Sequence, residues 1–271
     1  MDKRKQVAKY MLFDALAAAG AWALFYIYRK LYIEKGVFDQ FENIHIDSNF
    51  WVALFVIPAF WLAIYYVSGF YKDIYRRSRL IDFGHTFFSS LAGVVVIFFT
   101  LMLDDAILNY KNYYASFFTL LSLHFLLTLI PRLILTTQTN FKIHTRQIGF
   151  NTVIIGSNER AVKLFDEMNA IERPTGSIFV GFVQLDSRNG KLFGSKLPCL
   201  GEVKDLPKII DDNHIEEIVL AIETSEHNKI QEILSALDFR NVTVKAIPDM
   251  FDILSGTVKT SAIYASPLVK I

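Results

Sequence analysis

Uncharged, strongly apolar runs dominate the first half of this chain. Three of them, residues 48–71, 83–103 and 112–131, carry no formal charge over about the length that the hydrocarbon core of a bilayer demands. A fourth run, residues 10–28, is interrupted only by Asp14. Because backbone polar groups inside lipid find no water, each run predicts a membrane-spanning helix. Four such runs in succession disfavour the alternative of buried helices in a soluble core.

Lys and Arg are distributed unevenly among the segments that flank these runs. The N-terminal tail, the second connection and the stretch after the fourth run together hold eleven, whereas the first and third connections hold four. Segments rich in Lys and Arg stay on the cytoplasmic side of a membrane. The bias predicts a multi-pass protein with both termini cytoplasmic and with the first and third connections outside.

Three ionisable residues lie within the apolar runs, and we expect structural roles for all of them. Asp14 lies near the predicted cytoplasmic edge, where it can reach water or serve the first turn of its helix. His85 is also near an edge, and a neutral His124 can hydrogen-bond a neighbouring helix. A transporter or proton relay is expected to show a chain of carboxylates. Their scarcity in the runs favours an anchor or assembly module over a pump.

The pattern changes near residue 150, where short β-branched runs begin to alternate with amphipathic segments. Strands are predicted at residues 151–155, 177–185, 217–222 and 242–247. Helices are predicted to begin near Glu159, after Asp205 as N-cap, and after Ser225, whereas residues 186–200 are typical of a loop. Such alternation indicates parallel crossovers and a doubly wound sheet. The segment is short for a six-stranded dinucleotide fold, so one mononucleotide-binding half is expected.

The predicted fold class is therefore a membrane all-α four-helix bundle followed by a small α/β Rossmann-like (CoA-binding-like) domain with a mostly parallel sheet. The domains expected in order are a transmembrane bundle, a linker, a cytoplasmic Rossmann-like domain and a tail. Their predicted bounds are 1–136, 137–150, 151–247 and 248–271.

Composition agrees with this division. Of the 271 residues, 52% are hydrophobic and only 20% are charged, which excludes a disordered chain, a fibrous repeat and an ordinary cytosolic enzyme. The net charge of +1 argues against nucleic-acid binding through bulk charge. Cys199 is the one cysteine, so no intrachain disulfide can form, and no Cys/His cluster indicates zinc.

A candidate phosphate-binding turn follows the first predicted strand. Phosphate turns place a glycine at the tight bend, a second glycine where the backbone meets the phosphates, and a small residue where the helix packs on the strand. Here these positions hold Gly156, Asn158 and Ala161. The two departures from the pattern favour a plain strand–turn–helix corner, but a nucleotide site stays open as the alternative. The candidate ligand-binding residues of the turn are Gly156, Ser157, Asn158, Glu159 and Arg160.

Asp186 completes this candidate site. An acidic residue after the second strand of such a fold receives a ribose hydroxyl, usually about twenty residues beyond the glycines. Asp186 lies thirty residues after Gly156, which is further than the pattern requires. No metal-ligating set and no catalytic residue is predicted in the chain.

The order of these parts resembles the N-terminal region of the large bacterial polyprenyl-phosphate sugar-1-phosphate transferases. The phrases that carry the resemblance are VIIGSNERAVKLF, GEVKDLPKII, IEEIVLAI and, most specifically, PDMFDILSGTVKTSAIYASPLVKI. The resemblance implies a bacterial inner (cytoplasmic) membrane protein that takes part in exopolysaccharide, capsule or O-antigen assembly on undecaprenyl phosphate. It implies a homo-oligomer or a catalytic transferase partner, and a nucleotide or nucleotide sugar at the Gly156 turn.

In that family the reaction uses an Asp-Glu pair and magnesium in a catalytic domain that follows a segment like 267–271. We expect this chain to lack that domain and to be inactive alone. Asp104 and Asp105 form an adjacent acidic pair but fall in a predicted external connection. Two alternatives stay open: the N-terminal part of a membrane-bound nucleotide-sugar dehydratase, and a nucleotide-sensing membrane regulator.

Overall fold

The computed structural model contains two compact units, Met1–Asn140 and Phe141–Ile271. The structure describes residues 3–33, 48–72, 74–102, 110–171, 176–185, 193–222, 233, 237, 242–246 and 269–270. Most of the predicted helix after Ser225 and most of the tail lie outside the described residues, as do Asp104, Asp105 and Asp186. Ile233 and Leu237 of that helix are described as helical, and both are buried.

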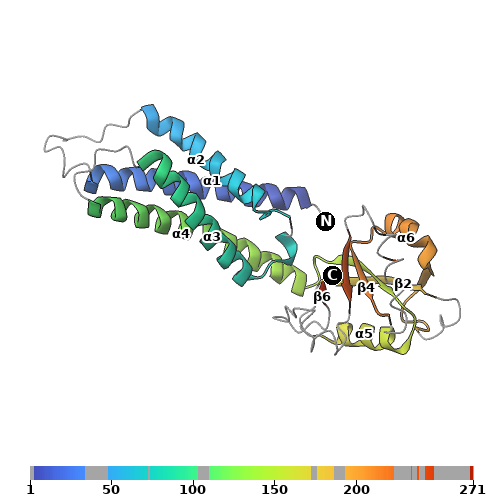
Figure 1. Ribbon diagram of the computed structural model, residues 1–271. Helices are drawn as coiled ribbons and strands as arrows, with labels where there is room; N and C mark the ends of the chain where they lie inside the picture. Colours follow the sequence, from blue (N-terminus) through green and yellow to red (C-terminus); the bar gives the residue numbers. More distant parts are fainter. Residues whose placement is uncertain are drawn as a thin grey trace. The chain divides into compact units, whose positions relative to one another are not determined.

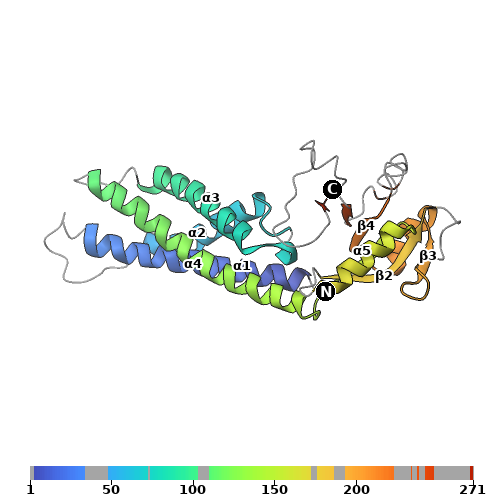
Figure 2. The same ribbon diagram turned by 90° about the horizontal axis from the view of Figure 1, so that it is seen from below.

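The first unit is a bundle of four long helices that run side by side (Figures 1 and 2). They are α1 (Lys3–Tyr28), α2 (Ser48–Val67), α3 (Arg79–Ile97) and α4 (Tyr110–His144). Short turns of other helix types extend or precede them: η1 (Arg29–Ile33), η3 (Ile74–Arg76) and η4 (Phe98–Met102). All four long helices are long and apolar enough to cross a membrane, as the uncharged runs predicted.

Aromatic side chains fill the centre of the bundle. Trp61, Tyr65 and Phe70 are almost completely buried, and Tyr10 and Phe25 of α1 pack in the same cluster. Large apolar side chains on the outer faces remain exposed, which suits helices surrounded by lipid rather than by water.

The second unit is a mostly parallel sheet with helices on its two faces. Its described strands are β1 (Phe150–Ile155), β2 (Ser177–Gln184), β3 (Cys199–Glu202), β4 (Glu217–Leu220), β5 (Thr243–Ala246) and β6 (Val269–Lys270). They are ordered β3-β2-β1-β4-β5-β6, and β1 to β5 pair in parallel whereas β6 is antiparallel to β5. The predicted α/β fold class with a mostly parallel sheet is confirmed.

Helices α5 (Glu159–Ala170) and α6 (Leu206–Asp212) cover opposite faces of this sheet (Figure 1). Leu164 and Phe165 of α5 pack on Ile154 and Val219 in one apolar core. Residues of α6 pack on the other face of the same strands in a second core. Successive side chains of β1 therefore point into the two cores in turn, as expected for a sheet that is buried on both faces.

Several details differ from the sequence prediction. Strands lie on both sides of β1, and three of the six have only four residues, so this short segment holds more than one mononucleotide-binding half. Part of the predicted 186–200 loop is strand β3, whose four residues are too few to show a period. Asp205 is the N-cap of α6 as predicted, but its side chain makes no capping bond, and the turn η5 (Val203–Asp205) precedes the helix. Helix α4 continues to His144 through the polar stretch expected to be a linker.

Candidate functional site

The predicted phosphate turn lies at the carboxyl end of β1, between neighbouring strands β2 and β4. This is the point where the strand order reverses, and ligands of open α/β sheets bind outside such a point. Gly156 has a φ of +132°, and a Cβ built there would lie 2.5 Å from the carbonyl oxygen of Ala221. Only glycine suits this backbone, so the close approach of β1 to the end of β4 explains the residue.

The rest of the turn forms the start of α5. Asn158 is the N-cap, and its Oδ1 accepts a hydrogen bond from the Ala161 backbone N–H at 2.9 Å. Ser157 is buried, Glu159 is exposed and Arg160 is half-buried. The structure thus brings Gly156 to Arg160 together at one edge of the sheet. The N-terminal end of α5 carries a partial positive charge, which suits an anion.

A second polar site, inside the helical bundle, was not predicted. It starts where α2 ends, in a turn with Gly69 at a φ of +73°. The N–H of Phe70 bonds to the carbonyl of Tyr65 at 2.9 Å, and that of Gly69 to the carbonyl of Tyr66 at 3.1 Å. These two bonds define a Schellman motif, which turns Phe70 back over Tyr65 and into the bundle.

Arg132 of α4 and Asp14 of α1 form the centre of this site. The Arg132 side chain is 1% exposed and binds Asp14 through two nitrogens, each 2.8 Å from a carboxylate oxygen. Its third nitrogen donates to Thr86 Oγ1 at 2.9 Å, and Tyr71 donates to Asp14 Oδ2 at 2.8 Å. Asp14 is therefore buried and paired: the expected structural role holds, and the expectation that its side chain reaches water is wrong.

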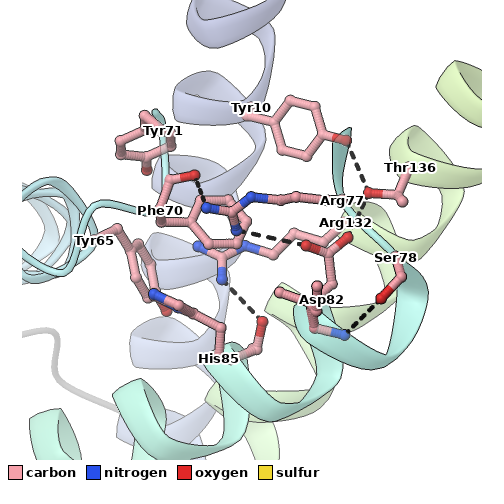
Figure 3. Close-up of polar contacts among 12 residues, drawn as sticks. Tyr10, Tyr65, Phe70, Tyr71, Arg77, Ser78, Asp82, His85, Arg132 and Thr136 are labelled. Atoms are coloured by element: carbon pink, nitrogen blue, oxygen red, sulfur yellow. Dashed lines mark hydrogen bonds and ion pairs between the residues drawn. The ribbon is translucent and has the colours of Figure 1, made fainter. Parts of the chain in front are cut away.

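A second ion pair, between Arg77 and Asp82, lies beside Arg132 (Figure 3). Asp82 at the start of α3 accepts a hydrogen bond from Thr136, which in turn contacts the Tyr10 hydroxyl at 2.9 Å. Arg77 Nη1 lies 3.5 Å from Asp82 Oδ1, and neither atom makes a hydrogen bond within the described residues. Burial lowers the pKa of Arg77, and the Asp82 carboxylate partly offsets this effect.

Phe70 connects the two pairs. The guanidinium of Arg132 lies 3.6 Å from the centre of the Phe70 ring, and that of Arg77 lies 3.8 Å from it. Arg132 also stacks on Tyr65 at 4.0 Å. Nη2 of Arg77 donates to the Phe70 carbonyl, so the same arginine holds both the ring and the backbone of this residue.

The histidines take the structural roles that the sequence indicates. His124 Nε2 lies 2.8 Å from the Tyr65 hydroxyl of α2, and its ring stacks on Trp61 at 3.5 Å. His85 contacts the carbonyl of Ser68 at 3.3 Å. The missed Asp14–Arg132 pair did leave a signal in the sequence. Asp14 and Arg132 carry opposite charges and lie near the same predicted side of the membrane, in the first and fourth spans. The charge bias explains Arg132 as a determinant of topology, which hides its role as a partner of Asp14.

Comparisons with known proteins give a family and two more distant likenesses. Residues 66–248 match the family model described as a CoA-binding domain. A UDP-glucose:undecaprenyl-phosphate glucose-1-phosphate transferase of Xanthomonas campestris pv. campestris is 34% identical over 56 residues, which are 21% of this chain and 12% of that protein. The crystal structure of UDP-D-quinovosamine 4-dehydrogenase from Vibrio fischeri overlaps 45% of this chain and 94% of its own at 18% identity. Its TM-score of 0.34 is too low to bear on function.

The matched segment extends from the last turn of α2 to beyond β5, so it covers parts of both units. Together with the transferase match, it supports the resemblance to the N-terminal region of the polyprenyl-phosphate sugar-1-phosphate transferases. The match spans about an eighth of that relative, as the 12% share shows. Since the family model matches more than half of the sequence, this four-span membrane chain belongs to the CoA-binding domain family.

Proposed function

We propose that residues 1–271 anchor and regulate an undecaprenyl-phosphate sugar-1-phosphate transferase that initiates exopolysaccharide, capsule or O-antigen synthesis. The observation that carries the proposal is the joining, in one chain, of four membrane spans to a CoA-binding-family sheet with a glycine turn at its switch point. The short match to a glucose-1-phosphate transferase supports the reaction class. In this proposal the transfer chemistry lies outside residues 1–271.

The regulatory part of the proposal assigns a nucleotide diphosphate to the turn from Gly156 to Arg160. CoA and UDP-sugars share this chemistry, and the start of α5 offers backbone N–H groups and the Arg160 side chain for it. Asp186 is proposed as the ribose contact. A ligand there would touch β1, the β4 end and α5 together.

Equilibrium binding of UDP-glucose and CoA to the full chain in lipid nanodiscs tests this assignment. Arg160→Ala is expected to weaken binding of the diphosphate ligand about tenfold, because a charge-assisted bond contributes on the order of 1.5 kcal/mol. Lys163→Ala, one turn further along α5 and exposed, removes the same charge and serves as the control. Equal affinity of both variants for either ligand would refute the site.

The proposed topology places both termini and the α/β unit in the cytoplasm of a bacterial cell. Cys199 is exposed and is the one thiol of the sequence, so the native chain carries its own reporter. A membrane-impermeant maleimide should label Cys199 in permeabilised cells and leave it unlabelled in intact spheroplasts. Labelling in intact spheroplasts would place the unit on the opposite side.

Sugar-phosphate transfer in isolated membranes tests the anchoring role. The chain alone is expected to transfer nothing from UDP-glucose to undecaprenyl phosphate, and transfer is expected when a catalytic transferase domain is supplied with it. Activity of residues 1–271 by themselves would contradict the proposal.

A further inference from the structure

The two ion pairs of the bundle differ in how well they are bonded. The Arg132–Asp14 pair is closed, with two bonds of 2.8 Å between the partners and further bonds to Thr86 and Tyr71. The Arg77–Asp82 pair is open, since its closest atoms are 3.5 Å apart and both lack a hydrogen bond within the described residues. Buried charged groups usually satisfy their hydrogen bonds, so the open pair calls for an explanation.

Arg77 belongs to a short segment between α2 and α3, residues 74–78, which we call the strap. Ile74 of the strap is 4% exposed and packs in the bundle core. Three contacts of Arg77 hold the strap to the end of α2. They are the bonds from Nη2 to the Gly69 and Phe70 carbonyls and the stacking of its guanidinium on the Phe70 ring. Phe70 itself stays fixed on its other side by Arg132 (Figure 3).

This end of the bundle is strongly basic on its outside. The bonds from Gln6 to Thr139 and from Tyr10 to Thr136 place the start of α1 beside the end of α4, and Thr136 contacts Asp82 at the start of α3. Exposed cations gather at the same end: Arg4, Lys9, Lys72 and Arg79. Such a cluster attracts the phosphodiester headgroups of anionic lipids.

We propose that the strap is a releasable latch and that an anionic lipid headgroup competes with Asp82 for Arg77. A phosphodiester offers Arg77 the paired hydrogen bonds that Asp82 does not give it. When the strap lifts, water reaches the Asp82 carboxylate, which keeps its bond from Thr136. The Arg132–Asp14 pair and the Schellman turn remain closed throughout, so the bundle stays folded.

Cysteine accessibility in the full chain tests the latch. In a Cys199→Ser background, Ile74→Cys places a thiol in the buried part of the strap. Its rate of reaction with a hydrophilic maleimide is measured in nanodiscs of phosphatidylcholine and of phosphatidylglycerol. We expect labelling to be about tenfold faster in phosphatidylglycerol. This ratio corresponds to a decrease of about 1.4 kcal/mol in the free energy of local opening of the strap.

Two variants separate the latch from a general loosening of the bundle. Arg77→Gln should label rapidly in both lipids. Lys163→Gln removes the same charge at an exposed position of α5, outside the basic cluster, and should keep the lipid dependence of the parent. Tryptophan fluorescence of Arg77→Gln should show an intact bundle. Equal rates in the two lipids would overturn the proposal. So would parental labelling of Arg77→Gln, or loss of the folded tryptophan signal in this variant.

Discussion

The pairing of Arg132 with Asp14 makes a quantitative prediction about the stability of the bundle. Arg132→Met leaves the Asp14 carboxylate buried, with Tyr71 as its remaining hydrogen-bond donor within the described residues. Breaking a buried pair on one side costs about 3–5 kcal/mol, since the other charge stays desolvated. Two cation–π contacts are lost as well, at about 0.5–2 kcal/mol each. Asp14→Leu should lower the free energy of unfolding by a similar amount, because it leaves the Arg132 guanidinium buried without its carboxylate partner.

The double variant Asp14→Leu/Arg132→Met distinguishes a paired unit from two independent losses. Removing both charges leaves no buried ion, so we expect it to lie within about 2 kcal/mol of the wild type. Unfolding is followed by tryptophan fluorescence while sodium dodecyl sulfate is titrated into dodecylmaltoside micelles. Arg79→Met, an exposed arginine of α3, should change the free energy of unfolding by less than about 0.5 kcal/mol. A double variant as unstable as the sum of the single ones would refute the reasoning.

Substitutions at four glycines test the close packing and the backbone conformation of the two units. Gly93→Ala should destabilise the bundle by about 1–3 kcal/mol in the same titration, because its Cβ would lie 2.3 Å from the Trp61 ring. Gly84→Ala is the control and should leave the stability unchanged, because a Cβ there would have no atom within 4 Å. Gly69→Ala should cost about 1–2 kcal/mol, and an asparagine there should cost less, since the position is left-handed. Gly156→Ala should lower the melting temperature of the α/β unit, read by circular dichroism; an unchanged melting curve would contradict the close approach to β4.

The fold class could be predicted because each of its signals is local. An uncharged run of about twenty residues has few alternatives in lipid, and the β-branched run before Gly156 marks the first strand. Strand β3 was missed because four residues including Gly201 give neither an apolar run nor an alternation. The extent of α4 was underestimated because its polar end leaves the apolar run while the backbone remains helical.

The buried ionic site of the bundle could not be predicted from local sequence patterns. Asp14 and Arg132 are 118 positions apart, and each has an adequate local explanation as a charge near a membrane edge. Phe70 and Arg77 are likewise ordinary residues of a short connection. Their meeting depends on how four helices pack, which is a tertiary property that no window of sequence contains. The turn at Gly156 was predictable because strand, glycine and helix follow one another directly.

The separation of Asp14 from Arg132 has a consequence for biogenesis. The first span carries its carboxylate into the membrane long before its cationic partner has been made, for the two are 118 residues apart. At about 5–20 residues per second, a ribosome needs on the order of 6–24 s to supply the missing arginine. During that interval the Asp14 carboxylate of the nascent first helix needs a polar environment, at the lipid surface or within the insertion machinery. A chain interrupted before the fourth span would keep the Asp14 carboxylate without its arginine partner, and membrane quality control could recognise this unpaired charge.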